Sequence, residues 1–222
     1  MAAACERYRA GFLGQPASAV TSIAFVVAGT GILVARSRSA SQCATPVRDQ
    51  QTVFGLLVTG IGLGSFIQHG PHPDWQAYAH DLPLAAVLVF VATDAVSDLS
   101  GRELSHRWWL VPSAGMAPVV ASGATASTIV QAAMAAAAVG LNLIRARRRP
   151  ALRTTVLVAL ATATAGAVIS TLMDRISACR PDSLVQGHAL WHVLAAAALW
   201  RLAPAIGARG RPAMPTGRWQ SE

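Results

Sequence analysis

Seven apolar stretches, each close to the length of a membrane-crossing helix, constrain this chain more than any other feature. A helix needs about 20 apolar residues to cross a hydrocarbon layer about 30 Å thick. The stretches cover residues 17–35, 51–69, 81–98, 107–123, 125–144, 152–173 and 186–206. Only 13% of the residues are charged, against about 25% in an ordinary soluble domain. We therefore predict an all-α fold, an integral membrane bundle of seven transmembrane helices.

The positions of the arginines predict the orientation of this bundle. Most of them lie in alternate connections, after the first, third and fifth stretches and in the tail: Arg36, Arg38, Arg48, Arg102, Arg107, Arg145, Arg147, Arg148, Arg149, Arg153, Arg209, Arg211 and Arg218. Cytoplasmic loops carry an excess of basic residues, so we predict that the N-terminus is outside and the C-terminus inside. Pro112 and Pro118 interrupt the fourth stretch, but a six-helix count would move the tail arginines outside. The charge pattern therefore favours seven helices.

The chain is predicted to form one membrane domain, residues 1–206, followed by an Arg/Pro-rich cytoplasmic tail, residues 207–222, that we expect to be disordered. A net charge of +8 would suggest nucleic acid as the partner of a soluble chain. Here the arginines lie between apolar stretches, so no nucleic-acid partner is expected.

Asp94 and Asp98 are interpreted as structural, with Asp98 at the cytoplasmic interface. The basic residues Lys and Arg are represented by arginine alone, in an alanine-rich chain. This composition suggests a bacterium, and we predict a multi-pass protein of its plasma (inner) membrane.

Histidines from separate stretches come to one depth, the outer end of the predicted bundle. His188 and His192 are four residues apart at the start of the last stretch, so on a helix they share one face. His69 ends the second stretch, and His80 and Asp81 begin the third. Ionisable residues inside a membrane are costly and usually face the bundle interior or a water-filled cavity. Their clustering predicts a functional site toward the outer face.

These residues match the requirements of a catalytic zinc site. Zinc in such sites has three protein ligands and a fourth position for water, and His69, His188 and His192 supply the three. Water activated by the metal attacks a carbonyl, and Asp81 is the candidate proton acceptor. Ser65 lies one turn before His69, where its hydroxyl can stabilise an oxyanion; alternatively, it bonds only the backbone of its own helix. A histidine pair at this spacing is by itself a weak sign of a metal.

Several motifs together resemble the alkaline ceramidase family of the CREST superfamily of seven-helix membrane hydrolases. They are Ser65 one turn before His69, an acid closely followed by Leu82-Pro83, the pair His188 and His192, the dipeptide Cys5-Glu6, and the run QPASAVTSIAF at 15–25. The resemblance spans nearly the whole chain. It implies a zinc-dependent hydrolase that cleaves a lipid amide, a C–N bond other than a peptide bond. It also implies that His69, His188 and His192 hold zinc, with Ser65 and an acid on the third helix as partners.

The sequence departs from this family at the acid. Family members place it three residues before the proline, but that position here is His80, and Asp81 follows one residue later. One residue is a rotation of about 100° on a helix. Either Asp81 acts from a shifted helix start or His80 acts as the base; we favour Asp81, because we expect His80 to lie in the preceding loop. Calcium, which eukaryotic relatives bind through several N-terminal acids, is not expected, since Glu6 alone remains and calcium needs about six to eight oxygen ligands.

The resemblance and the predicted site imply one function and one alternative. The expected function is zinc-dependent intramembrane hydrolysis of a lipid amide, with metal-activated water attacking the carbonyl and the lipid substrate entering from the bilayer. The alternative is a receptor-like or binding protein of the same superfamily, in which zinc is structural. Turnover of a lipid amide by the purified, zinc-loaded protein separates the two.

The predicted orientation also sorts the three cysteines. Cys5 and Cys179 lie on the outer side, whereas Cys43 lies in a cytoplasmic connection. Disulfides persist outside the reducing cytoplasm, so we predict a Cys5–Cys179 bond and a free Cys43, a pairing that the ceramidase resemblance also suggests. The alternative is that Cys5 and Cys179 are small apolar residues at an interface.

The orientation can be tested with reporter fusions. A reporter that is active only in the cytoplasm should give a signal when fused after Arg149 and none when fused after Gln76, because the basic residues from Arg145 to Arg153 hold the fifth-to-sixth connection inside. The opposite pattern would invert the bundle and place the histidines on the cytoplasmic side.

Overall fold

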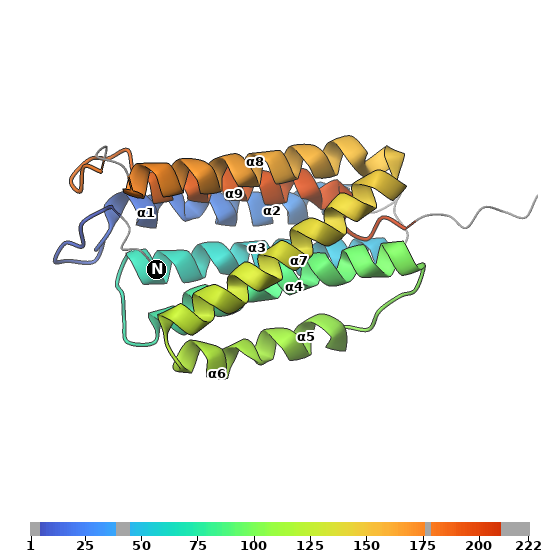
Figure 1. Cartoon of the computed structure of the whole chain (residues 1–222), viewed down its shortest axis with the longest axis horizontal. Coiled ribbons are helices and arrows are strands. Elements are labelled where there is room, and N and C mark those ends of the chain that lie inside the picture. Colours follow the sequence, from blue (N-terminus) through green and yellow to red (C-terminus); the bar gives the residue numbers. More distant parts are fainter. Residues whose placement is uncertain (1–4, 39–44, 176–178, 210–222) are drawn as a thin grey trace, which may run out of the picture.

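The computed structural model describes residues 5–38, 45–175 and 179–209, which form helices and their connections (Figure 1). In chain order the elements are α1 (Pro16–Thr21), α2 (Ile23–Arg38), α3 (Thr45–His69), α4 (Gln76–Ser100), α5 (Arg107–Ala114), α6 (Met116–Ala121), α7 (Ala124–Arg148), α8 (Pro150–Arg175), α9 (Gly187–Leu202) and the 3-10 helix η1 (Ala203–Ala205). This described part of the chain contains no strand. The predicted all-α class is confirmed.

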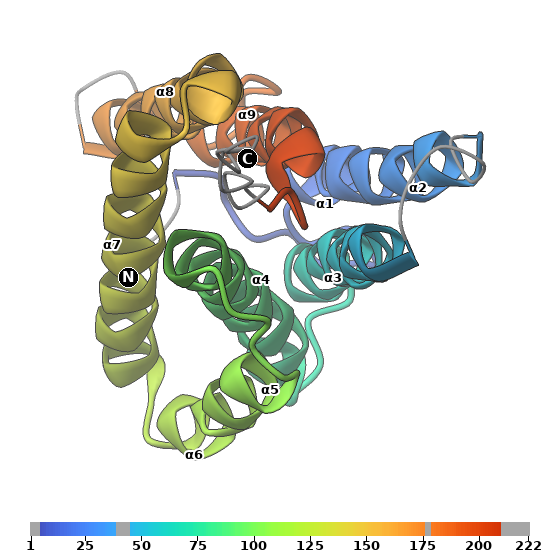
Figure 2. The same cartoon turned by 90° about the vertical axis from the view of Figure 1, so that its right-hand side faces the viewer.

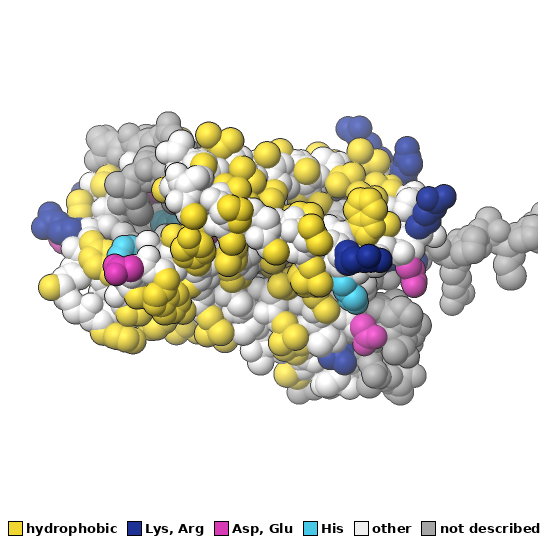
Figure 3. Space-filling view, turned by 90° about the horizontal axis from the view of Figure 1, so that it is seen from below, with side chains coloured by type: hydrophobic (Ala, Val, Ile, Leu, Met, Phe, Trp, Pro, Cys, Tyr) yellow, Lys and Arg dark blue, Asp and Glu magenta, His cyan; other side chains and the backbone are white. Residues whose placement is uncertain are grey.

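Five segments are long and apolar enough to cross a membrane. They are Pro16–Ser37, which includes α1 and most of α2, Asp49–His69, Gln76–Ser100, Ala124–Arg148 and Pro150–Asp174. The charged side chains gather toward the two ends of the molecule, and the surface between them is largely apolar or uncharged (Figure 3). The protein is therefore embedded in a membrane and crosses it several times.

Six of the helices form a closed ring. In chain order α2, α3, α4, α7, α8 and α9 each contact the next, and α9 contacts α2. Figure 2, a view from one end, shows this ring, with α5 and α6 outside it against α4. Side chains such as Phe54, Val58, Phe90 and Val156 fill the interior and are almost completely buried. The rings of Phe54 and Phe90 stack with their centres 6.1 Å apart.

Two of the predicted stretches are each split into two helices. The first is split between α1 and α2 at Ser22, and the fourth between α5 and α6 at Gly115. Pro118 accounts for the second break, because it has no N–H to bond the carbonyl of Ala114 and its ring would clash with that carbonyl. The fourth stretch is consequently the least regular of the seven.

The helix that carries Asp81 begins earlier than predicted. α4 starts at Gln76, so His80 lies inside the helix and is buried. The expectation that His80 lies in a loop is wrong. Residues 76–80 are too polar to be recognised as part of an apolar stretch, but they form the first turn and a half of α4, and Ala79 and His80 lie against Gly64 of α3.

Buried charges join α4 and α7 at the end of the bundle far from His80. The side chain of Arg145 is fully buried; its Nε donates to Oδ2 of Asp98 at 2.8 Å and its Nη1 to Oδ2 of Asp94 at 3.0 Å. Arg149 donates to the other oxygen of Asp98. Both acids thus join α4 to α7, which agrees with a structural role, and the side chain of Asp98 is enclosed by protein.

The chain after η1 completes this charge network. The N–H of Gly207 donates to Oδ1 of Asp94 at 3.1 Å, and Nη1 of Arg209 donates to the same oxygen at 2.8 Å. Nη2 of Arg145 donates to the carbonyl of Ala205, the last residue of η1, and to that of Ala208. Residues 207–209 therefore belong to the folded bundle, which corrects the predicted start of the tail. The rest of the tail lies outside the described residues.

Gly64 lets α3 and α4 approach each other closely where α4 begins. A Cβ at Gly64 would lie 1.9 Å from the carbonyl oxygen of Ala79 and 3.2 Å from the Cα of His80. That carbonyl has no helical donor four residues later, because Pro83 lacks an N–H. Gly64 thus sets how near His80 comes to the helix that ends in His69.

The Gly64→Ala substitution should destabilise the protein and displace the start of α4. The added methyl group meets backbone, which cannot rotate away, so we expect a loss of about 1–3 kcal/mol and a lower melting temperature in detergent. Gly60→Ala is the matched control on the same helix, because its Cβ would lie 3.5 Å from Pro83, an ordinary contact. Equal melting temperatures for the two variants would contradict this packing.

Candidate metal centre

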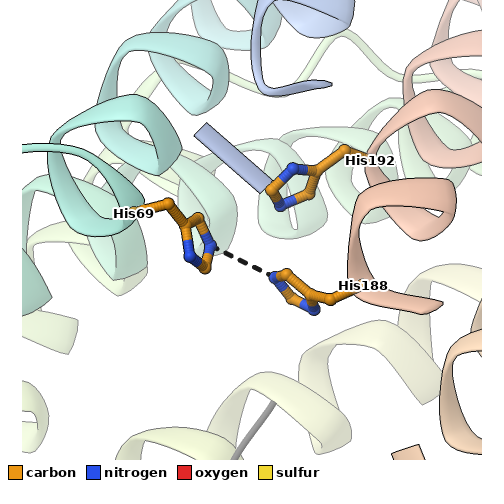
Figure 4. A group of neighbouring side chains, drawn as sticks. All are labelled: His69, His188 and His192. Atoms are coloured by element: carbon orange, nitrogen blue, oxygen red, sulfur yellow. Dashed lines mark hydrogen bonds between the residues drawn. The ribbon is translucent and has the colours of Figure 1, made fainter. Parts of the chain in front are cut away.

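Three histidines from two helices converge at one end of the bundle (Figure 4). His69 is the last residue of α3, and His188 and His192 lie one turn apart at the start of α9. One ligand nitrogen from each lies within 4.8 Å of the others, and the Nε2 atoms of His69 and His188 are 3.2 Å apart. The prediction that these three histidines meet is confirmed.

The spacing of these nitrogens fits a metal ion. Two nitrogens bound to a tetrahedral zinc at about 2.0–2.1 Å are about 3.3 Å from each other, close to the separation between His69 and His188. Imidazole nitrogens suit zinc, copper, iron and nickel. The three histidines could therefore hold an ion of this class.

Acceptors from α1 and the segment before it orient two of the rings. Nδ1 of His69 is 2.7 Å from Oε1 of Gln15, and Nδ1 of His192 is 3.1 Å from the carbonyl oxygen of Ser18. The side-chain amide nitrogen Nε2 of Gln15 donates to the backbone carbonyl of Glu6. This bond turns Oε1 of Gln15 toward His69. Because both partners accept, each Nδ1 carries a proton and each Nε2 is left free to bind a metal.

The carboxylate of Glu6 holds the start of α1 in place. It accepts hydrogen bonds from the N–H groups of Ala17 and Ser18, at 2.7 and 3.0 Å, and from the Ser18 hydroxyl, at 2.7 Å. A negative group at a helix N-terminus is favourable, because the exposed N–H groups carry partial positive charge. Glu6 therefore fixes the carbonyl of Ser18 that orients His192.

A disulfide ties the N-terminal segment to the connection before α9. Cys5 and Cys179 are bonded, with their Cα atoms 5.5 Å apart, and the N–H of Arg7 donates to the carbonyl of Pro181. The predicted pairing is confirmed. Cys43, predicted to be free, lies outside the described residues.

A chain of hydrogen bonds adjoins the three histidines. The ring of His80 lies edge-on to that of His69, with the centres 6.2 Å apart. Nδ1 of His80 is 2.7 Å from Oδ1 of Asp81. On α7, the Ser127 hydroxyl donates to Oδ2 of Asp81 at 2.5 Å and accepts a bond from the amide of Gln131 at 2.8 Å. Asp81 thus has a partner at each oxygen.

The structure brings all six predicted site residues to this end of the bundle. Ser65 is buried one turn before His69, and His80 and Asp81 lie within the second turn of α4.

Sequence reasoning missed four residues that orient the others. Ser127 and Gln131 are polar residues four positions apart in an alanine-rich stretch, a spacing that marks one face of a helix and could have identified them. Gln15 and Ser18 carry no such signal, because their contacts arise only when the N-terminal segment lies against α3 and α9.

No model of a known protein family matches the chain, and no curated protein matches it. The resemblance to the alkaline ceramidases therefore stays a hypothesis carried by the motifs. The chemistry of the site has to be inferred from its own geometry.

The purified protein should bind about one zinc ion per chain. His69→Ala, His188→Ala and His192→Ala should each lose the metal, because each removes a ligand, whereas His72→Ala, which changes an exposed histidine of the loop after α3, should keep it. Gln15→Leu should weaken zinc binding by about 10–100-fold, since it removes the acceptor that orients His69. Elemental analysis and competition with a chelator measure these effects. Stoichiometric zinc in all three alanine variants would rule out the site.

Proposed function

We propose that this protein is a zinc-dependent intramembrane hydrolase that cleaves a lipid amide, as its resemblance to the alkaline ceramidases implies. The observation that carries the proposal is the convergence of His69, His188 and His192 beside the His80–Asp81 pair, inside a membrane-embedded bundle. Three histidines are a ligand set of catalytic zinc, which keeps a position open. A proton-transfer group next to that position is the second requirement of metal-assisted hydrolysis.

Zinc bound by the three histidines would act as a Lewis acid that acidifies water and polarises a carbonyl oxygen. The protein contributes orientation and exclusion of bulk water. Gln15 and Ser18 hold two of the ligand rings in position, and His69 and His192 are almost completely buried. Ser65, buried one turn before His69, is suited to donate a hydrogen bond to the oxygen on which negative charge develops.

We assign proton transfer to His80 and an orienting role to Asp81. With its Nδ1–H directed to Asp81, a neutral His80 ring has an unprotonated Nε2 that can accept a proton. Nε2 would take a proton from the attacking water and return it to the amine nitrogen as the C–N bond breaks. Asp81, held by Ser127, would stabilise the charge that the ring acquires, as the acid of a catalytic triad does.

An apolar cavity supports a lipid as the substrate. It has a volume of about 270 Å³ and lies between α4, α7, α8 and α9. Trp191, which precedes His192 in the sequence, forms part of its wall, and Leu199 and Leu202 line it further along α9. A hydrocarbon chain placed there would lie against apolar side chains on the helix that carries His188 and His192.

The proposal includes seven crossings, an outer N-terminus, an inner C-terminus and a bacterial plasma membrane. α5 with α6, and α9 with η1, would add two crossings to the five long segments. α9 runs alongside α8 for most of its length (Figure 1). With an outer N-terminus and seven crossings, α9 would begin on the outer side. The histidines would then lie toward the outside and Arg145 toward the cytoplasmic side.

The zinc-loaded wild-type protein should release fatty acid from a ceramide in detergent micelles. His80→Ala should lower the rate by about 10²–10⁴-fold, the usual contribution of a general base, while leaving zinc bound. Asp81→Asn should lower it less, because His80 remains in the site without its orienting partner. Mass spectrometry of the released fatty acid measures turnover, and His72→Ala is the control for nonspecific effects.

Two results would count against this proposal in different ways. A larger loss in Asp81→Asn than in His80→Ala, with zinc retained in both, would make Asp81 the base. A lack of turnover of ceramides and simpler lipid amides by protein that holds stoichiometric zinc would refute the hydrolase and favour the receptor-like alternative with a structural metal.

A further inference from the structure

A groove beside α9 has largely apolar walls and is also lined by an arginine. It has a volume of about 260 Å³, and its walls include Ile32 and Arg36 from α2, Gln51 from α3, and Trp200 and Pro204 from α9 and η1. Among the residues that the structure describes, none that lines the groove is acidic. The groove therefore combines apolar walls with a cation.

The Nε atom of Arg36 is buried and lacks a hydrogen-bond acceptor within the described part of the protein. Leaving a buried donor unbonded costs about 1–3 kcal/mol, and more for a charged group. Arg145, by contrast, is bonded to two carboxylates and two carbonyls. Arg36 is thus a site where an acceptor from outside the chain would be stabilising.

The groove lies at the depth where the apolar segments end. Arg36 is the last residue but one of the segment Pro16–Ser37, and Gln51 is near the start of Asp49–His69. Lipid phosphates lie just beyond the hydrocarbon layer, and tryptophan is enriched at the same boundary. Trp200, which is 46% exposed, marks this boundary on α9.

One wall of the groove is shaped by a close contact between α2 and α9. A Cβ at Gly31 would lie 1.9 Å from Cζ3 of Trp200, so the indole lies directly on the backbone of α2. Beside it, Nε2 of Gln51 approaches the carbonyl of Ala203 at 3.5 Å. The ring and Ile32 thus offer an apolar wall, while Arg36 and Gln51 supply donors at one end.

We propose that this groove binds a phospholipid of the adjoining leaflet, with the phosphate against Arg36 and an acyl chain along Ile32 and Trp200. A guanidinium forms two parallel hydrogen bonds with a phosphate. Free phosphate would satisfy Arg36 but would leave the apolar wall uncovered, so the lipid is the occupant that uses both parts. The groove is about 20 Å along α2 from the residues that contact His192. It is therefore separate from the metal centre, and the bound lipid is distinct from the substrate.

The test is a titration of delipidated full-length protein with phosphatidylglycerol in neutral detergent, followed by native mass spectrometry. Arg36→Gln keeps a side chain of similar shape and removes the charge, and we expect about tenfold weaker binding. Arg201→Gln is the matched control: it removes an exposed arginine of α9 that does not line the groove, with the same change in net charge. Its affinity should stay within about twofold of the wild type.

Three further measurements decide the assignment. Trp200→Ala should also weaken binding, because it removes the apolar wall, and Arg36→Lys should give an intermediate affinity, because an ammonium group lacks the bidentate geometry. Wild-type affinity in Arg36→Gln, with its melting temperature unchanged, would overturn the proposal. Competition by inorganic phosphate at concentrations comparable to those of the lipid would also overturn it, because the groove would then be a site for the free anion.

Discussion

Hydrocarbon offers no hydrogen bonds, so polar groups inside a membrane-embedded bundle have to be satisfied by other parts of the chain. Arg145 shows this most clearly, because it is fully buried and bonds Asp94, Asp98 and two backbone carbonyls near the end of the described chain, those of Ala205 and Ala208. Removing one partner of such a buried pair costs about 3–5 kcal/mol. α4, α7 and the end of the chain are held together at this point, and the register of α4 against α7 follows from it.

The same two helices are joined again beside the candidate metal centre. Asp81 lies about 26 Å from Asp98 along α4, and Ser127 lies about the same distance from Arg145 along α7. Because the two intervals are nearly equal, the Asp98–Arg145 pair and the Asp81–Ser127 hydrogen bond form in one register. The position of the His80–Asp81 pair therefore depends on charges at the opposite end of the bundle.

The N-terminal segment forms a further side of the candidate metal centre. Gln15 and Ser18 orient ligand histidines, Glu6 holds the start of α1, and the disulfide of Cys5 joins the segment to the connection that leads into α9. These contacts act on rings whose free nitrogens face one another. Gly64 also contributes, because its lack of a side chain lets the first turns of α4 lie close to α3.

Properties that depend on the order of residues along the chain could be predicted from the sequence. Helix length and apolar character predicted the all-α membrane fold, the spacing of His188 and His192 placed them on one face, and the position of His69 at the end of a stretch brought it to the same depth. Only the tertiary structure decided that His80 lies inside α4, that its partner is Asp81, and that Arg145 is buried between Asp94 and Asp98. The physical reason is that these contacts join residues on neighbouring helices or depend on packing at a helix end. The hydropathy of one segment carries no information about which side chains of other helices lie against that segment.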